Sequence, residues 1–352
     1  MTGDDMRYGA LSAKVRALYG KRLRTEDFAR LAGLKSEAEI LDALGQYPGW
    51  SRALAKCEPG SWSYVGRVEL ETALREELRL EYLSLAHYVP REDRPLMGFR
   101  IRIAERTAIL NALRRLKVGK YGMGMPPASS IVVLGKVDYK ALRECASYDQ
   151  LLSAAKGSIY YPVLLHLRPE PGGPLPDYTT AECLLRTAYF SHMFRMANQN
   201  YHGPARKVLL QALGGQVDLL NIIHILRLKT YFPDTPQDKY LTILFPFHYR
   251  LKPELTRQLC AAPDAGAVFA LLKQTPYRDC FEGVEALDAE EYYRRAMYTF
   301  NRHQLLCTPP SIYTAMAYLD LKEMEMMVLV NVIESVKYGV PYHAALAELV
   351  GA

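Results

Sequence analysis

Histidines are the residues in this chain best suited to bind a metal or to move a proton. None of them forms the H-E-x-x-H pattern that places two imidazoles on one face of a helix, and none has a carboxylate at a metal-ligand spacing. His224 lies in a strongly apolar segment, where we expect a hydrogen-bonded core side chain rather than a ligand. We therefore predict no metal site among the eight histidines, which are His87, His166, His192, His202, His224, His248, His303 and His343.

Glycine and serine patterns supply no catalytic motif. The run Gly119–Gly124 has the glycine content of a phosphate-binding loop, but its order is not that of a P-loop and it follows a predicted helix rather than a strand. We expect a flexible connector there. No G-x-S-x-G nucleophile motif occurs in the chain.

Closely spaced carboxylates are the remaining candidates for acid–base chemistry. On a helix, adjacent side chains point about 100° apart, which suits solvation better than a shared reaction. The pairs are Glu76/Glu77, Glu290/Glu291 and the similarly split Glu323/Glu325. We predict no catalytic residue and no cofactor, although a site assembled from distant residues stays open.

Composition indicates an ordinary globular protein. Of 352 residues, 49% are hydrophobic and 23% charged, and the net charge of +6 comes from 44 basic and 38 acidic residues that are interspersed. This mixing disfavours nucleic acid as a partner, while the small positive excess favours an acidic protein. The six cysteines include no C-x-x-C pair and are expected to be reduced and mostly packed.

Targeting and membrane signals are missing from the sequence. The N-terminal residues MTGDDMRYG form no signal peptide. The most apolar stretches, Leu219–Leu228 and Met326–Ile333, are shorter than the roughly 20 residues that cross a bilayer. We predict no direct membrane insertion, so that any work at a membrane goes through a partner.

Three helical segments recur at a constant spacing and predict an internal repeat. Asn111, Asn221 and Asn331 are separated by 110 residues each (221 − 111 and 331 − 221). Around each one, apolar residues occupy the same four positions, with the spacing i, i+1, i+4, i+7 of one helix face. Coincidence between three amphipathic helices explains the periodicity, but it explains the matching asparagines less well. The segments are Ile103–Lys120, Leu213–Thr230 and Glu323–Val340.

A second recurring element precedes each of these helices. A Ser or Asp that could cap a helix begins a short apolar helix, which ends in a polar turn containing Tyr. The copies are Ser36–Trp50, Ser147–Tyr161 and Asp264–Arg278, and the last two keep the pattern Lys-x-[Ser/Thr]-x-Tyr. Long helices follow at about Leu70–Tyr88, Thr180–Tyr201 and Ala289–Leu306.

The predicted fold is therefore all-α, with three similar units. We place them at residues 1–121, 122–232 and 233–352, with breaker clusters at Gly122–Pro127 and Pro233–Pro236 marking the joints. Units of this size favour three lobes around a pseudo-threefold axis over an open solenoid, whose repeats are typically about 20–45 residues long.

Ordered motifs at the start, middle and end of the chain resemble the C-subunit family of V-type ATPases, the bacterial and archaeal counterparts of the d subunit of eukaryotic V-ATPases. The family commonly has an Arg in the last helix where this chain has Val328–Val330. The matching segments are Tyr8–Leu18, Asp218–Asn221 with Arg227–Lys229, and Pro309–Tyr313 followed by Tyr318-Leu319-Asp320-Leu321-Lys322-Glu323-Met324-Glu325.

The resemblance implies a funnel of three helical lobes without catalytic activity. Such a protein joins the central-stalk subunits to the proteolipid rotor ring and transmits torque for hydrogen ion or other ion transport and ATP synthesis. It lies at the cytoplasmic face of the membrane as a peripheral protein held by its partners. Asn111, Asn221 and Asn331 would be structural repeat anchors.

Three bases are candidate contacts to acidic stalk residues: Arg16, Arg227 and Lys337. They could equally cap helix C-termini, where a positive charge is favourable. The sequence leaves two other hypotheses open: a generic helical scaffold for another soluble protein, and an enzyme whose site is assembled across the lobes.

Overall fold

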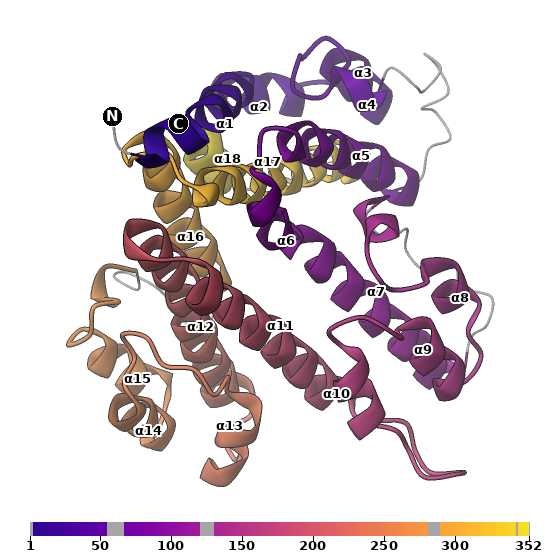
Figure 1. Ribbon diagram of the computed structural model, residues 1–352, viewed down its shortest axis with the longest axis vertical. Coiled ribbons are helices and arrows are strands. Elements are labelled where there is room, and N and C mark those ends of the chain that lie inside the picture. Colours follow the sequence, from indigo (N-terminus) through magenta and orange to yellow (C-terminus); the bar gives the residue numbers. More distant parts are fainter. Residues whose placement is uncertain (1–2, 55–66, 120–129, 281–288, 343, 352) are drawn as a thin grey trace.

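The computed structural model describes residues 3–54, 67–119, 130–280, 289–342 and 344–351, and in these ranges the chain contains helices and no strand (Figure 1). The all-α prediction is thus confirmed. The α-helices are α1 (Gly3–Tyr19), α2 (Thr25–Ala32), α3 (Glu37–Leu44), α4 (Ser51–Leu54), α5 (Arg67–Ala86), α6 (Arg94–Met97), α7 (Phe99–Val118), α8 (Tyr139–Glu144), α9 (Tyr148–Ala154), α10 (Tyr161–His166), α11 (Tyr178–Asn200), α12 (Gly203–Tyr231), α13 (Gln237–Ile243), α14 (Pro253–Ala261), α15 (Ala265–Leu272), α16 (Ala289–Leu306), α17 (Ile312–Tyr338) and α18 (Ala344–Gly351).

The three asparagine-bearing segments are the helices α7, α12 and α17, and each begins earlier than its repeat pattern predicted. Pro204 lies in the first turn of α12, where its missing N–H is not needed. Ser311 caps α17 in a reciprocal arrangement with Thr314. The α7 and α17 helices end at Gly119 and Gly339, both in the left-handed conformation that favours glycine.

Short capped helices occur at all three predicted places. The side chains of Ser36, Ser147 and Asp264 accept the N–H groups of Glu39, Gln150 and Ala267, which begins α3, α9 and α15. Each of these helices follows another short helix, namely α2, α8 or α14, after a short turn, and we call each such consecutive pair a hairpin. The turns after α9 and α15 are also alike, since Ser158 and Thr275 accept the N–H of Tyr160 and Tyr277.

One buried carboxylate on each long helix α7, α12 and α17 holds the chain at the entrance to a hairpin. On α7, Glu105 accepts the N–H groups of Lys136 and Val137, two residues before α8. On α17, Glu325 accepts the N–H of Leu23, two residues before α2, at 3.1 Å. We call these contacts, with the third described next, the carboxylate clasps.

The third clasp is the most extensive. Asp218 on α12 accepts the N–H groups of Tyr249, Arg250 and Leu251 at 2.7–3.1 Å, two residues before α14 begins, together with the hydroxyl of Tyr277 at 2.6 Å. Its side chain is buried, as are those of the other two clasp carboxylates. Charge-assisted bonds of this kind satisfy backbone donors that would otherwise be buried without a partner.

Each of the three helices that carry a clasp carboxylate also packs against another long helix. The α7 helix packs on α11, α12 packs on α16, and α17 packs on α5, which lies at the opposite end of the sequence. The α17 helix also packs on α1, α2, α3 and α18. The two chain ends consequently lie near one another (Figure 1), and the backbone of Gly351 in α18 lies directly against Thr25 in α2.

A single helix of the described residues, α12, is long and apolar enough to cross a membrane by length and composition; its most apolar window has a mean hydropathy of 1.4. The apolar stretch Leu219–Leu228 is shorter than a membrane span, but the helix that contains it extends from Gly203 to Tyr231. Since 61% of that window is buried inside the molecule and Asp218 is bonded within it, α12 behaves as a core helix.

The three repeat asparagines lie one each on α7, α12 and α17 but differ in burial. Asn221 is buried, donates to the carbonyl of Phe245 at 3.1 Å and accepts its N–H at 2.8 Å. Asn111 and Asn331 are both partly exposed. Asn221 thus fixes the segment after α13 against α12.

We expect Asp218→Ala to lower the free energy of unfolding by about 2–4 kcal/mol, because it leaves three backbone N–H groups, that of buried Leu251 among them, and the buried hydroxyl of Tyr277 without their acceptor. Chemical denaturation followed by circular dichroism measures this change. Asp234→Ala, at an exposed position after α12, is the control and should have little effect. Equal stabilities of the two variants would contradict the importance of the clasp.

Asn221→Ala should cost about 2–4 kcal/mol, since both backbone groups of Phe245 lose their partner. Asn111→Ala provides the matched comparison at a partly exposed position and should cost less than about 1 kcal/mol. Denaturant midpoints of the two variants test this difference, and an equal loss in both would show that the asparagines act alike.

Candidate functional site

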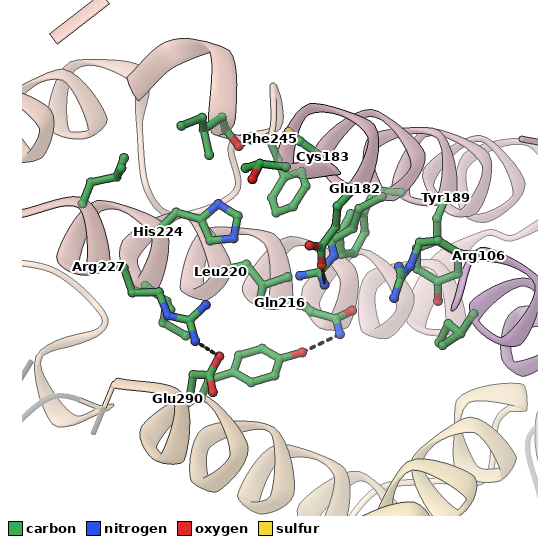
Figure 2. A pocket seen from close by; sticks show the side chains of 18 of the residues that line it. Arg106, Glu182, Cys183, Tyr189, Gln216, Leu220, His224, Arg227, Phe245 and Glu290 are labelled. Carbon is green, nitrogen blue, oxygen red and sulfur yellow. Dashed lines mark hydrogen bonds and ion pairs between the residues drawn. The ribbon is translucent and has the colours of Figure 1, made fainter. Parts of the chain in front are cut away.

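A cavity of about 570 Å³ lies between α11, α12 and α16, with α7 at one end (Figure 2). The inward faces of these helices contribute both charged and apolar side chains. The charged ones are Arg106, Glu182, Arg186, Arg227, Glu290 and Arg294. The long helices hold these groups in place because their opposite faces are packed in the core.

Two carboxylates neutralise part of the positive charge on the cavity wall. Glu182 pairs with Arg186 one turn along α11, at 2.9 Å. Glu290 on α16 is shared, since it pairs with Arg227 of α12 and lies 3.6 Å from Arg294. Figure 2 shows the Arg227–Glu290 pair bridging two helices at one side of the cavity.

Arg106 enters the cavity from α7 and pairs with no carboxylate of the described residues. Its guanidinium lies over the ring of Tyr189, 5.7 Å from the centroid. Burial lowers its pKa, and the nearby positive charge of Arg186 lowers it further. Like charges therefore gather at this end of the cavity, with fewer carboxylates than guanidinium groups around it.

Neutral polar groups complete the wall. The ring centroids of His224 and Phe245 lie 5.5 Å apart. Burial, helped by Arg186 and Arg227, lowers its pKa to about 4, so that the imidazole is uncharged at neutral pH. Gln216 of α12 donates to the hydroxyl of Tyr293 on α16 at 2.7 Å, which links the two helices across the cavity.

An ion-pair group joins α7 to α17. Arg100 contacts Asp320 at 3.3 Å and also pairs with Glu323. Burial raises the pKa of the Asp320 carboxyl to about 6, while the positive charge of Arg100 opposes this rise. This group ties one end of the cavity-lining helix α7 to the last long helix.

The structure places the three candidate stalk contacts in different surroundings. Arg227 faces the cavity and pairs with Glu290. Lys337 lies in the last turn of α17 and pairs with Glu37 of α3 at 3.0 Å, and Arg16 is exposed in the last turn of α1. Only Arg227 of the three therefore lines the cavity.

Sequence reasoning missed most of the charged residues that matter in the structure. It interpreted the pairs Glu76/Glu77 and Glu323/Glu325 as solvated, but Glu77 is buried against Arg52, and Glu325 is buried with Trp50 and Leu23. The identical spacing of Glu105 and Glu325 relative to Asn111 and Asn331 was a signal that could have revealed two clasps.

Cys145, Cys183 and Cys260 are free and buried as expected, whereas Cys307 is exposed. Most of the Gly119–Gly124 run and the Gly122–Pro127 joint lie outside the described residues. Across the part of the chain that is described, no group of three or more His, Cys, Asp or Glu side chains is placed to hold a metal ion.

Asp320→Asn should change how stability depends on pH. In the folded protein Asp320 keeps its proton up to about pH 6, while in the unfolded chain it releases the proton near the ordinary pKa of 3.8. The wild type should therefore lose stability relative to the Asn variant as pH rises from about 4.5 to 7. Denaturant titrations of both proteins at these two pH values measure the difference, and parallel pH profiles would contradict the raised pKa.

Comparison with known proteins identifies relatives over nearly the whole chain. The family model of the ATP synthase (C/AC39) subunit matches residues 11–346. The C subunit of the A-type ATP synthase of Methanosarcina mazei is 25% identical over 285 residues, which cover 80% of this chain and 74% of the relative. That of Methanosarcina barkeri is 25% identical over 279 residues, covering 78% and 72%. This chain therefore belongs to the ATP synthase (C/AC39) subunit family.

Proposed function

We propose that this protein is a non-catalytic coupling subunit of a rotary V/A-type ATPase or ATP synthase. It would join the central stalk to the proteolipid rotor ring and transmit torque between them for ion transport. Membership of the ATP synthase (C/AC39) subunit family supports the assignment to such a complex. ATP chemistry and ion passage would then take place in other subunits.

The observation that carries the coupling role is the cyclic order of the carboxylate clasps. The clasp on α7 holds the hairpin α8–α9, the one on α12 holds α14–α15, and the one on α17 returns to the first hairpin, α2–α3. Contacts that link each predicted unit to the next, and the last unit to the first, resist the twisting of one unit against another. Torque transmission requires this stiffness.

The same order supports a funnel of three lobes around a pseudo-threefold axis. We propose that the lobes are built from units 1–121, 122–232 and 233–352. Under this assignment the asparagine helix of one unit lies against the long helix of the next, as α7 does against α11, α12 against α16 and α17 against α5. The central stalk would enter at the mouth and the rotor ring would lie at the base.

Charge supports an acidic stalk surface as the partner at the mouth. Arg227 is the favoured contact of the three predicted bases, because it alone lines the cavity, where guanidinium groups outnumber carboxylates. Arg16, exposed on α1, would contact a partner at a different place. The protein would be held at the cytoplasmic face of the membrane through its partners, with α12 remaining in the core.

A generic scaffold for an unrelated soluble protein is the alternative. Affinity purification of the tagged full-length chain from its own cells distinguishes the two. Recovery of both the stalk and the ring proteins of the ATPase supports the coupling role. Recovery of the chain in complex with another protein and without these subunits would contradict it.

Glu325→Gln tests the coupling role in the assembled complex. Loss of the charge weakens the clasp that holds the first hairpin to α17. We expect the variant complex to hydrolyse ATP at more than about half the wild-type rate, while the number of ions pumped per ATP falls severalfold. The reason is that the weakened subunit twists instead of transmitting torque. Hydrolysis and ion uptake measured in the same proteoliposomes give this ratio.

Glu254→Gln is the matched control, since Glu254 is exposed and pairs with the equally exposed Arg257. Circular dichroism and an inventory of the proteins in each purified complex verify that the variants fold and assemble. An unchanged ratio of ions pumped to ATP hydrolysed in an assembled Glu325→Gln complex would overturn the proposed role of the clasp.

A further inference from the structure

We infer that the cavity between α11, α12 and α16 binds a small molecule through a phosphate or polyphosphate group. The inference goes beyond the coupling role and does not rest on it, because it comes from the charges and the size of the cavity alone. No part of the coupling argument requires a small ligand there.

Charge balance is the first reason. Four guanidinium groups from four different helices, α7, α11, α12 and α16, line the cavity with only two carboxylates. Glu290 serves both Arg227 and Arg294, and Arg106 has no carboxylate partner among the described residues. Since His224 is neutral, two positive charges remain for a ligand to neutralise. A dianion matches this excess.

Unused hydrogen-bond groups are the second reason. The buried Nε of Arg186 and Nδ1 of His224 lack a hydrogen-bond partner, and both residues line the cavity. A buried polar atom without a partner is costly, and a bound oxyanion could satisfy the arginine donor. The other ring nitrogen of His224 donates to the backbone of Ile243, so Nδ1 of the neutral imidazole is an acceptor that can bond a protonated ligand oxygen.

Size and lining favour a small molecule over an inserted protein segment. The volume of about 570 Å³ falls in the range of about 300–1,000 Å³ that is usual for small-molecule sites. Tyr189, Phe190 and Tyr293 provide an aromatic surface beside the guanidinium groups. Guanidinium forks bind the oxygens of phosphates and carboxylates in pairs alike, but a phosphate group can carry the second negative charge that the excess on this wall requires, and a single carboxylate cannot.

Isothermal titration of the purified full-length chain at low salt tests the inference, with pyrophosphate and ADP as separate probes. We expect binding of at least one probe that weakens as salt is added. Similar affinities for both would indicate recognition of the phosphates alone. Tighter binding of ADP would indicate that the aromatic surface holds the rest of a nucleotide.

Two substitutions in the cavity wall should change the affinity for the phosphate probes in opposite directions. Arg106→Gln should weaken binding about tenfold, because it removes the arginine that lacks a carboxylate partner. Glu290→Gln should tighten binding severalfold, because it releases Arg227 and Arg294 from their shared carboxylate. Arg257→Gln, an exposed site on α14, is the control and should leave binding unchanged.

Several outcomes would overturn the inference. These are the absence of binding of both probes at millimolar concentration, binding that is insensitive to Arg106→Gln in a folded variant, and weaker binding by Glu290→Gln. Binding of poly-glutamate with no binding of either phosphate probe would also overturn it, in favour of an acidic protein segment. Should Arg106→Gln fail to fold, the Glu290→Gln result decides. Co-purification with ATPase subunits tests the coupling role separately, and its result does not depend on whether the cavity binds phosphate.

Discussion

The bond between the buried carboxylate of Glu325 and the N–H of Leu23 is the contact on which the architecture depends most. These residues are 302 positions apart, so the contact joins the last long helix to the first hairpin. The indole of Trp50 donates to the same oxygen at 2.9 Å, and the ammonium group of Lys322 lies 3.7 Å from the centre of the indole ring. A carboxylate buried with this many partners is stabilising only while all of them are in place.

The two other carboxylate clasps differ from this one in a physical way. Glu105 and Asp218 hold hairpins that follow closely in the chain, so little conformational entropy is lost in forming them. Glu325 instead closes a contact across nearly the full sequence, which must be stabilised by packing. The α17 helix supplies this packing, since most of its apolar residues are buried against α1, α2, α5 and α16. The Glu325 contact therefore depends on the packing of α17 in the core.

The cavity has its chemistry because the long helices are held at fixed positions around it. Arg106, Arg186, Arg227 and Arg294 belong to four helices, and their charges are brought together against electrostatic repulsion. Core packing of the opposite helix faces, and the shared pairing of Glu290, offset this repulsion. Charged walls of this kind favour recognition of an anionic partner or ligand, and the described part of the chain shows no cluster of groups arranged for metal chemistry.

What the sequence determined by itself is local. Helical periodicity and the caps at Ser36, Ser147 and Asp264 are set by residues within a few turns of one another, and the observed helices follow them. The ordered motifs also indicated the C-subunit family of V-type ATPases, and the match of the ATP synthase (C/AC39) subunit model to residues 11–346 agrees with this.

Only the tertiary structure decided which carboxylates are buried and which arginines face the cavity. Glu77 and Glu325 have the sequence context of solvated charges, but Arg52, Trp50 and Leu23 reach them from distant segments. Periodicity shows which side of a helix is apolar, whereas the neighbour of a polar side chain depends on where another helix lies. That position follows from the packing of the whole chain, so no local pattern of residues contains it.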